Sequence, residues 1–481
     1  MFQRNKDYNP NEIARNQIRS LSRRDLIKLS GGCAALSSTS LLAQLLNLQL
    51  TKTAVAAEGD AEGYKALVCV FLFGGVDSFN VLAPYEDDEY AAYSAIRTNL
   101  ALPQEDLHPI TDSNGRQFGV HPGMQGIADI FNAGDAAFVA NVGSLIQPTD
   151  RQSYDSQSSL PLGLFSHSDF IQHWQTSIPQ SRSSVNGWVG RMADMLTDSV
   201  NDNPHISMNI ALNSLNIMQT GSTVTPYIVA TNGATTLGGY SQTTGNTSNK
   251  IYTQATDGLL GRTYSDLLEQ TFADRKRSSI DGAAEFNAAV GEIELTTVFP
   301  ASSLAEQLKM VAKAIAARDT LSQRRQIFFV SAGGWDHHDD LLSKQAGMLP
   351  MVSGAMSAFY EATKELGCEN EVTTFTASDF ARTLTTNGDG SDHAWGGNHI
   401  VMGGAVNGSH VYGTYPESLN PSDNVLDVGR GRLIPTTSVD EYNAELANWF
   451  GIPNDSSLES VLPNVRNFFG AGSTLPLGFL S

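Results

Sequence analysis

Three apolar segments that each end on an aspartate constrain the fold of this chain most strongly. The segments are residues 67–77, 326–336 and 372–379, and their last residues are Asp77, Asp336 and Asp379. Continuous apolar runs are typical of strands buried on both faces, as in a parallel sheet covered by helices. In open α/β sheets, ligands bind beyond the carboxyl ends of the strands. We therefore expect the three aspartates to meet at one edge of a sheet.

A segment rich in glycine and histidine, residues 390–399, precedes a further apolar run at 400–404. Carboxylates and imidazoles that meet at one edge repel one another, or keep unpaired lone pairs, unless a cation joins them. The pattern therefore predicts a site for divalent metal ions. Its candidate ligands are Asp77, Asp336, His338, Asp379 and His393. A tight turn capped by Asp77 and a solvated, acidic helix start at Asp336 remain the alternatives for those two residues.

The composition limits the classes of partner. The chain has 481 residues with a formal net charge of −20, which argues against nucleic acid and against docking on anionic lipid. A small anionic ester remains possible as a substrate, because bound cations reverse the local sign of the charge. After the leader, no window is apolar enough to span a bilayer, so we expect no integral membrane segment in the mature chain. The three cysteines, at 33, 69 and 368, do not predict a disulfide framework.

The first 56 residues resemble a twin-arginine export signal. Arg23 and Arg24 precede a moderately apolar stretch, and Ala54 to Ala56 offer the small residues that signal peptidase reads. We expect the twin-arginine export machinery to be a partner of the precursor, cleavage after Ala56, and a periplasmic or secreted protein.

The remainder, residues 64–480, predicts an α/β domain: a three-layer sandwich with a mostly parallel central sheet. Residues 201–279 are rich in Thr, Ser, Gly and Asn, which indicates an insertion or cap with short strands and long loops. We also expect a capping-box helix start at Ser303 to Glu306, a helix broken at Pro350, and a capping box from Ser438 to Glu441.

Two further residues are candidates for catalysis. Ser166 lies at a predicted helix start, where the helix N-terminus favours an attacking alkoxide and an incoming oxyanion. The alternative is a plain N-cap, with Asp169 three residues later. Arg382 offers a planar fork for an oxyanion, and the alternative is a structural salt bridge to Asp379 or Asp389.

Six motifs resemble one family of exported bacterial proteins, known as domain of unknown function 1501. They are residues 74–80, 167–174, 333–338, 379–383, 392–399 and 436–442. The resemblance runs from about residue 64 to 450 and is weakest over 201–279. This family is similar in fold to the alkaline-phosphatase-like superfamily. The resemblance implies a two-metal hydrolase of phosphate or sulfate esters, with a nucleophile at a helix N-terminus.

The resemblance also assigns the candidate ligands to two metal sites. It implies that Asp77 and Asp379 hold one metal, and that Asp336 and His338 hold the other with His393. Two departures stand out: Phe380 occupies a position where the superfamily usually has histidine, and Asp336 and His338 are two residues apart rather than four. Either a vacancy is filled by His399 or Asp392, or only one metal binds.

Two functions follow as expectations. The first is an exported metal-dependent hydrolase, whose metal is zinc, manganese, calcium or magnesium. The second is a catalytically silent envelope protein that binds or scaffolds with the same fold. The altered ligand spacing and Phe380 motivate the second function.

Overall fold

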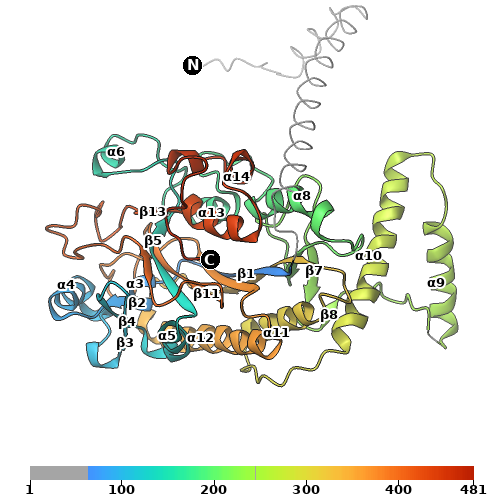
Figure 1. Ribbon diagram of the computed structural model, residues 1–481, viewed down its shortest axis with the longest axis horizontal. Helices are drawn as coiled ribbons and strands as arrows, with labels where there is room; N and C mark the ends of the chain where they lie inside the picture. The colour runs from blue at the N-terminus through green and yellow to red at the C-terminus, as the bar shows by residue number, and fades with distance from the viewer. Residues whose placement is uncertain (1–62, 244) are drawn as a thin grey trace, which may run out of the picture. The chain divides into compact units, whose positions relative to one another are not determined.

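The computed structural model describes residues 63–243 and 245–481, so the predicted signal peptide at 1–56 lies outside the described residues. One large sheet has the strand order β12-β5-β11-β10-β1-β9-β6-β7-β8, with β13 paired to β5 (Figure 1). Its strands are β1 (Lys65–Phe73), β5 (Ala136–Gly143), β6 (Asn209–Leu212), β7 (Tyr227–Ala230), β8 (Gly233–Ala234), β9 (Arg325–Gly333), β10 (Val372–Ser378), β11 (Gly397–Met402), β12 (Val411–Gly413) and β13 (Thr437–Ser438).

The three predicted apolar strands are neighbours at the centre of this sheet. β1 pairs in parallel with β10 on one side and with β9 on the other, and β6 and β7 continue the parallel pairing beyond β9. β11 runs antiparallel to both β10 and β5, and β8 runs antiparallel to β7. The structure thus confirms the α/β class with a mostly parallel central sheet.

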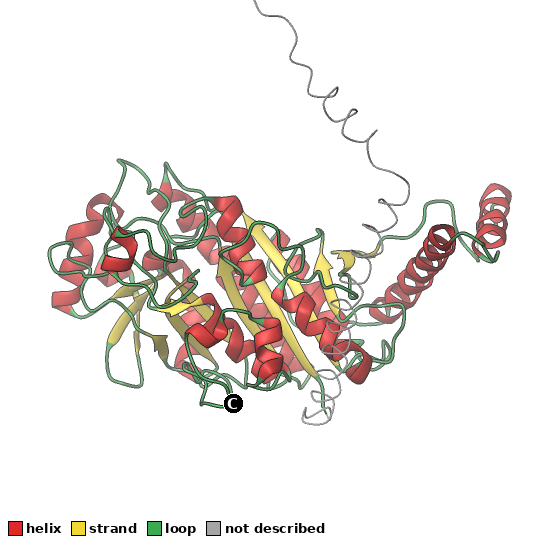
Figure 2. Cartoon of the chain, turned by 90° about the horizontal axis from the view of Figure 1, so that it is seen from above, coloured by secondary structure: helices red, strands yellow, loops and turns green. Residues whose placement is uncertain are grey.

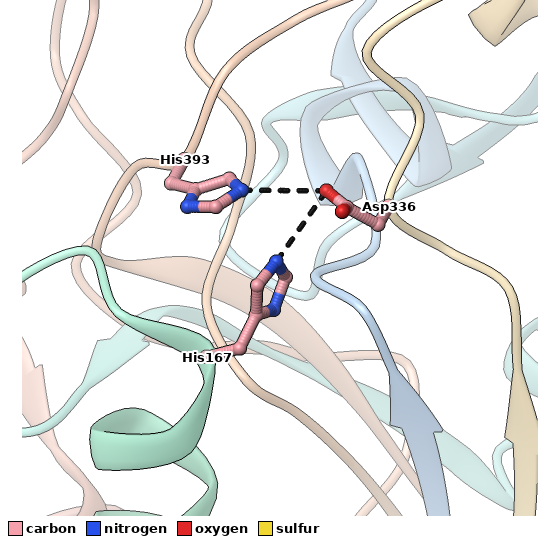
Figure 3. Close-up of side chains that lie close together, drawn as sticks. All are labelled: His167, Asp336 and His393. Carbon is pink, nitrogen blue, oxygen red and sulfur yellow. Dashed lines mark hydrogen bonds and ion pairs between the residues drawn. The ribbon is translucent and has the colours of Figure 1, made fainter.

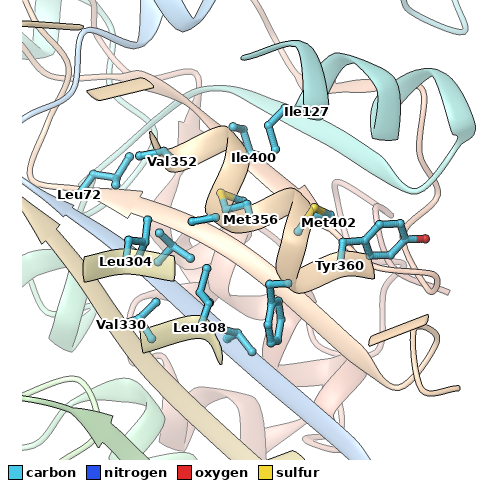
Figure 4. Close-up of a cluster of buried hydrophobic side chains, with 14 of the residues drawn as sticks. Leu72, Ile127, Leu304, Leu308, Val330, Val352, Met356, Tyr360, Ile400 and Met402 are labelled. Carbon is cyan, nitrogen blue, oxygen red and sulfur yellow. The ribbon is translucent and has the colours of Figure 1, made fainter. Parts of the chain in front are cut away.

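Helices cover both faces of the sheet (Figures 1 and 2). One group comprises α5 (Gln125–Ala133), α11 (Ser303–Ala316) and α12 (Leu341–Glu365), and the other comprises α7 (His167–Thr176), α8 (Trp188–Val200), α13 (Val439–Phe450) and α14 (Ser456–Val461). Side chains that alternate along β1 lie in one core cluster, among them Val68, Val70 and Leu72. Leu304 and Leu308 of α11 and Met356 of α12 belong to this same cluster (Figure 4). The result is the helix–sheet–helix layering that two buried sheet faces require.

Shorter elements complete the described chain. A second sheet has the order β2-β4-β3, from strands Leu82–Pro84, Gln117–Val120 and His108–Thr111. The other helices are α3 (Ser78–Val81), α4 (Asp87–Arg97), α6 (Arg151–Asp155), α9 (Thr247–Leu260) and α10 (Leu267–Gly291), with 3₁₀ turns at Thr98–Leu100, Gln104–Asp106, Pro122–Met124 and Val465–Asn467. Among the described residues, no helix combines the length and the apolar character that crossing a bilayer requires.

Some local predictions hold and others need correction. The capping box from Ser438 to Glu441 forms and starts α13, whereas Ser302 rather than Ser303 caps α11. α12 continues through Pro350 instead of breaking there. The Pro350 ring lies so close to Gly123 that a Cβ on the glycine would approach it to 2.6 Å. This tertiary packing offsets the hydrogen bond that proline removes from the helix.

The segment 201–279 contains the expected short strands and long loops, and also two helices that its composition does not indicate. Its residues supply β6, β7 and β8, which extend the central sheet past β9, and then α9 and the first half of α10. β6 and β7 have only four residues each, and β6 pairs with β9 and β7, so these strands depend on neighbours that their own short sequences do not reveal.

Candidate metal centre

The carboxyl ends of β1, β9 and β10 meet, as the strand pattern predicts. β1 ends at Phe73, and Gly74 and Gly75 follow with φ angles of 121° and 82°. A Cβ on Gly74 would lie 2.6 Å from the backbone nitrogen of Asp336, so only glycine permits this approach. The turn therefore brings the residues after β1 and β9 into direct contact.

Asp336 is the centre of a histidine cluster at this edge. Its Oδ1 lies 3.0 Å from Nε2 of His338, 3.3 Å from Nε2 of His393 and 3.4 Å from Nε2 of His167. The ligand atoms of His167, Asp336 and His393 all lie within 4.8 Å of one another (Figure 3). His338 contacts two of these residues, because its Nε2 also lies 3.0 Å from Nε2 of His393.

Acceptors behind the three imidazoles fix their orientation. Nδ1 of His167 lies 2.7 Å from Oδ2 of Asp379, and Nδ1 of His393 lies 2.8 Å from the carbonyl oxygen of Phe165. Nδ1 of His338 lies 3.1 Å from Oδ1 of Asp392. A carbonyl oxygen or an ionised carboxylate only accepts hydrogen bonds, so each Nδ1 carries a proton. In a neutral ring, the lone pair on Nε2 then faces the carboxylate of Asp336.

The pKa shifts of Asp336, His393 and His167 have different causes and directions. Burial opposes ionisation of Asp336, but the hydrogen bond and charge of Arg382 lower its pKa to about 2. Burial lowers the pKa of His393, whereas the hydrogen bond to Asp379 raises the pKa of His167. Nε2 of His167 is buried and makes no hydrogen bond to any described residue. A neutral His393 directs its Nε2 lone pair at the anionic carboxylate of Asp336. A histidine and a carboxylate that bind the same metal ion have this arrangement.

The distances also fit an ion. A tetrahedral site with bonds of about 2.0–2.1 Å separates its ligand atoms by roughly 3.3 Å. Oδ1 of Asp336 lies 3.3 Å and 3.4 Å from the Nε2 atoms of His393 and His167. His167, Asp336 and His393 could therefore hold one ion through two imidazoles and one carboxylate.

Arg382 has a different role from the one its sequence position indicates. Its buried guanidinium donates to the carbonyl oxygens of Gly75 at 2.8 Å and Ser391 at 3.2 Å, and also to those of Gly74 and Trp335. It further pairs with Oδ1 of Asp336, rather than with Asp379 or Asp389. With its donors occupied by main-chain carbonyls, Arg382 holds Asp336 and the strand-end turns in place. The predicted oxyanion clamp is thus replaced by a positioning contact.

Asp77 is separate from the cluster. It is fully buried and forms an ion pair with Arg97, which also donates to the carbonyl oxygens of Thr383 and Leu384. Burial raises the pKa of Asp77, and the charge of Arg97 opposes that rise. The predicted metal contact of Asp77 is corrected to this ion pair, because α4 brings a buried guanidinium to the carboxylate.

Two other predicted ligands, Asp379 and His399, do not contact Asp336. Asp379 accepts hydrogen bonds from His167 and from the Gly74 N–H, so both of its oxygens are engaged and it orients the His167 ring. His399 is buried in β11 with its ring centre 4.6 Å from that of Trp174, and burial lowers its pKa to about 3. His399 is therefore a neutral core histidine, and the predicted ligand role is corrected.

Ser166 lies beside the centre without contacting Asp336. It occupies the position before α7, but its Oγ lies 3.1 Å from Oγ of Ser168 and does not cap the helix. Asp169, the expected partner in a cap, pairs with Arg182. The contacts of Ser166 therefore establish neither of its two predicted roles, the N-cap of α7 or the nucleophile.

The sequence interpretation missed His167. This residue follows Ser166 directly and opens one of the six family-like motifs, so the signal was present in the segment 165–169. A histidine far from any strand end has no spacing pattern that marks it as a ligand. His337, between Asp336 and His338, is buried.

Comparisons with known proteins add one family and a set of distant structures. A family described as "Protein of unknown function (DUF1501)" matches residues 64–429. No curated protein matches the chain.

Among solved structures, lipoteichoic acid synthase LtaP from Listeria monocytogenes is 9% identical, and the match covers 79% of this chain and 76% of that chain at a TM-score of 0.29. The PsFucS1 sulfatase from Pseudoalteromonas sp. is 10% identical, over 76% and 68% of the two chains, also at 0.29. Scores this low transfer no residue role to this chain.

Proposed function

We propose that this chain, which belongs to the DUF1501 family, is a metal-dependent hydrolase that acts on a small phosphate or sulfate ester. His167, Asp336 and His393 hold the ion, with His338 beside them. The observation that carries the proposal is the convergence of imidazole nitrogens on one oxygen of Asp336, at 3.0–3.4 Å. Without a cation, a neutral His393 would direct its lone pair at an anionic oxygen.

The donor set narrows the choice of metal. Calcium and magnesium prefer sites made of oxygen ligands, whereas imidazole suits zinc and other transition ions. Two or three imidazoles and one carboxylate therefore favour zinc over calcium and magnesium, and manganese, a transition ion that also accepts carboxylates, is the second candidate. When bound, such an ion acts as a Lewis acid and lowers the pKa of a coordinated water or hydroxyl.

The protein residues have distinct tasks in this proposal. Asp379 and the carbonyl of Phe165 orient His167 and His393, and Arg382 fixes Asp336. Ser166 is our candidate nucleophile, because it directly precedes His167 at the N-terminus of the ten-residue helix α7. That terminus favours both a developing alkoxide and the oxygens of an anionic ester. An anionic substrate is then recruited locally in spite of the net charge of −20.

A second function is supported by a specific observation. Arg97 neutralises Asp77, and Arg382 has its donors occupied, so the two-metal arrangement of the superfamily does not assemble around these residues. Under this reading, the protein is a non-catalytic envelope protein in which one ion acts as a structural staple.

An activity screen separates the two functions. The purified full chain is assayed with zinc or manganese against phosphomonoesters, phosphodiesters and sulfate esters, beside His393→Ala and His205→Ala. His205 is a matched control, because it is also partly exposed and pairs with a carboxylate, at 2.7 Å from Glu285, outside the cluster. Turnover that His393→Ala abolishes and His205→Ala keeps supports the hydrolase. No turnover of any ester, in a protein that binds the ion, favours the scaffold.

Export by the twin-arginine route is part of the same proposal. Its support is the Arg23–Arg24 pair, the modestly apolar stretch and the small residues up to Ala56. Replacing both arginines by lysine should retain an uncleaved precursor in the cell. Normal export of that double variant would contradict the proposed periplasmic or secreted localisation.

A further inference from the structure

α10 is divided into two halves with different surroundings. The second half is anchored in the core through Ala283, Phe286, Ala289 and Val290. The first half, with α9 beside it, lies outside the layers of the central sheet (Figures 1 and 2). We call α9 and residues 267–279 of α10 the hairpin.

The hairpin exposes large apolar side chains in a helical pattern. Ile251 and Leu259 are eight residues apart on α9 and are 62% and 50% exposed. Leu268 and Phe272 are four residues apart on α10 and are 79% and 69% exposed. Each pair therefore lies on one face of its helix. Tyr252 and Leu267 add to the same exposed set.

The contact between the two helices uses small and polar residues instead. Thr253 and Ala273 are the buried residues of α9 and of the first half of α10. Arg277 pairs with Asp257 at 2.5 Å, and the Tyr240 hydroxyl donates to the same carboxylate at 2.8 Å. This is the reverse of an ordinary amphipathic hairpin, which buries its large apolar residues between the helices. Such an outward apolar face is typical of an interaction surface.

The charge of the hairpin, compared with that of the whole chain, favours a second copy of this chain as the partner. Residues 247–277 contain five basic and four acidic residues, whereas the whole chain carries −20. Two copies repel each other over most of their surfaces but approach without repulsion at the hairpin. An anionic membrane would repel the same acidic body, and so it is the less favoured occupant.

We propose that two copies of this chain pair hairpin to hairpin about a two-fold axis and form a four-helix bundle. A two-fold interface uses one patch twice, so a self-complementary apolar face suffices. The exposed apolar side chains of the hairpin are 45–79% exposed, and burying six of them from each copy removes on the order of 1,000 Å², the area that a specific interface needs.

Sedimentation velocity of the full chain tests the proposal. The wild type should form a dimer at micromolar concentrations, and Leu268→Glu/Phe272→Glu should weaken the association at least about tenfold, because four carboxylates would then meet at the interface. Val298→Glu/Val425→Glu is the matched control, because these residues are 87% and 78% exposed but lie outside the hairpin. The control should remain dimeric.

Three outcomes would overturn the proposal. The first is a wild type that stays monomeric up to about 100 μM. This concentration lies well above the dissociation constants expected for a specific interface of this size. The second is a dimer that persists in Leu268→Glu/Phe272→Glu. The third is a monomer that sediments with phosphatidylcholine–phosphatidylglycerol vesicles only while Leu268 and Phe272 are intact, which would make a membrane the occupant.

Discussion

Nδ1 of His167 lies 2.7 Å from Oδ2 of Asp379, a carboxylate that is only 1% exposed. The contact joins the start of α7 to the end of β10, which are 212 residues apart in the sequence. It sets the imidazole so that Nε2 faces Asp336. A buried carboxylate behind a histidine is the arrangement by which proteins orient a metal ligand and raise its basicity.

Replacing Asp379 by asparagine should weaken metal binding. Asparagine has one acceptor where Asp379 uses two, for His167 and for the Gly74 N–H. We expect the affinity for zinc to fall about 10- to 100-fold, as is usual for such supporting residues. Titration calorimetry provides the measurement. Asp339→Asn, at an exposed carboxylate that pairs with Lys344, should leave the affinity unchanged.

Removing the carboxylate of Asp77 should destabilise the fold without removing the metal. Asp77→Ala leaves Arg97 charged and buried, which should cost about 3–5 kcal/mol in the free energy of unfolding. The double variant Asp77→Ala/Arg97→Met should recover much of that loss. Chemical denaturation and metal analysis check both points, and loss of the ion in Asp77→Ala would restore Asp77 as a ligand.

Arg382→Lys should affect stability and metal affinity together. Lysine keeps the charge but loses the fork that serves the carbonyls of Gly75 and Ser391 and the carboxylate of Asp336. We expect the free energy of unfolding to fall by about 2–4 kcal/mol, because buried acceptors lose their donors. A rise in KM with unchanged stability and unchanged metal affinity would instead indicate that Arg382 binds substrate.

His399 should make stability fall in acid. Burial lowers its pKa to about 3 in the folded state, against about 6.5 in the unfolded chain. Its contribution is complete above pH 6.5 and is lost as the pH falls toward 3, with a slope of at most about 1.4 kcal/mol per pH unit. Denaturation of His399→Gln between pH 7 and pH 4 should show a smaller slope than the wild type. Identical slopes would contradict a buried neutral histidine.

The central sheet and its functional edge were predictable from sequence because their signals are local. The apolar runs that became β1, β9 and β10 are recognisable without knowing their neighbours, and a parallel arrangement brings their ends together. The capping box from Ser438 to Glu441 is likewise predictable, because it depends on only four consecutive residues.

The errors concern long-range partners. Nothing near Asp77 in the sequence indicates that Arg97, twenty residues later, would neutralise it. His399 belongs to the same motif as His393, but β11 directs it into the core beside Trp174. His167 was missed because its partners Asp379 and Asp336 come from distant strands. Sequence spacing does not encode such tertiary contacts.

Metal content tests the central claim most directly. The full chain is produced in cells grown in metal-replete medium, as wild type, His167→Ala/His393→Ala and His205→Ala. The metal content of each purified protein is measured by inductively coupled plasma mass spectrometry. We predict about one equivalent of zinc or manganese in the wild type and in His205→Ala, and below about a tenth in the double variant. Less than about half an equivalent of any divalent metal in the wild type, or a full equivalent in the double variant, would contradict a metal centre at His167, Asp336 and His393.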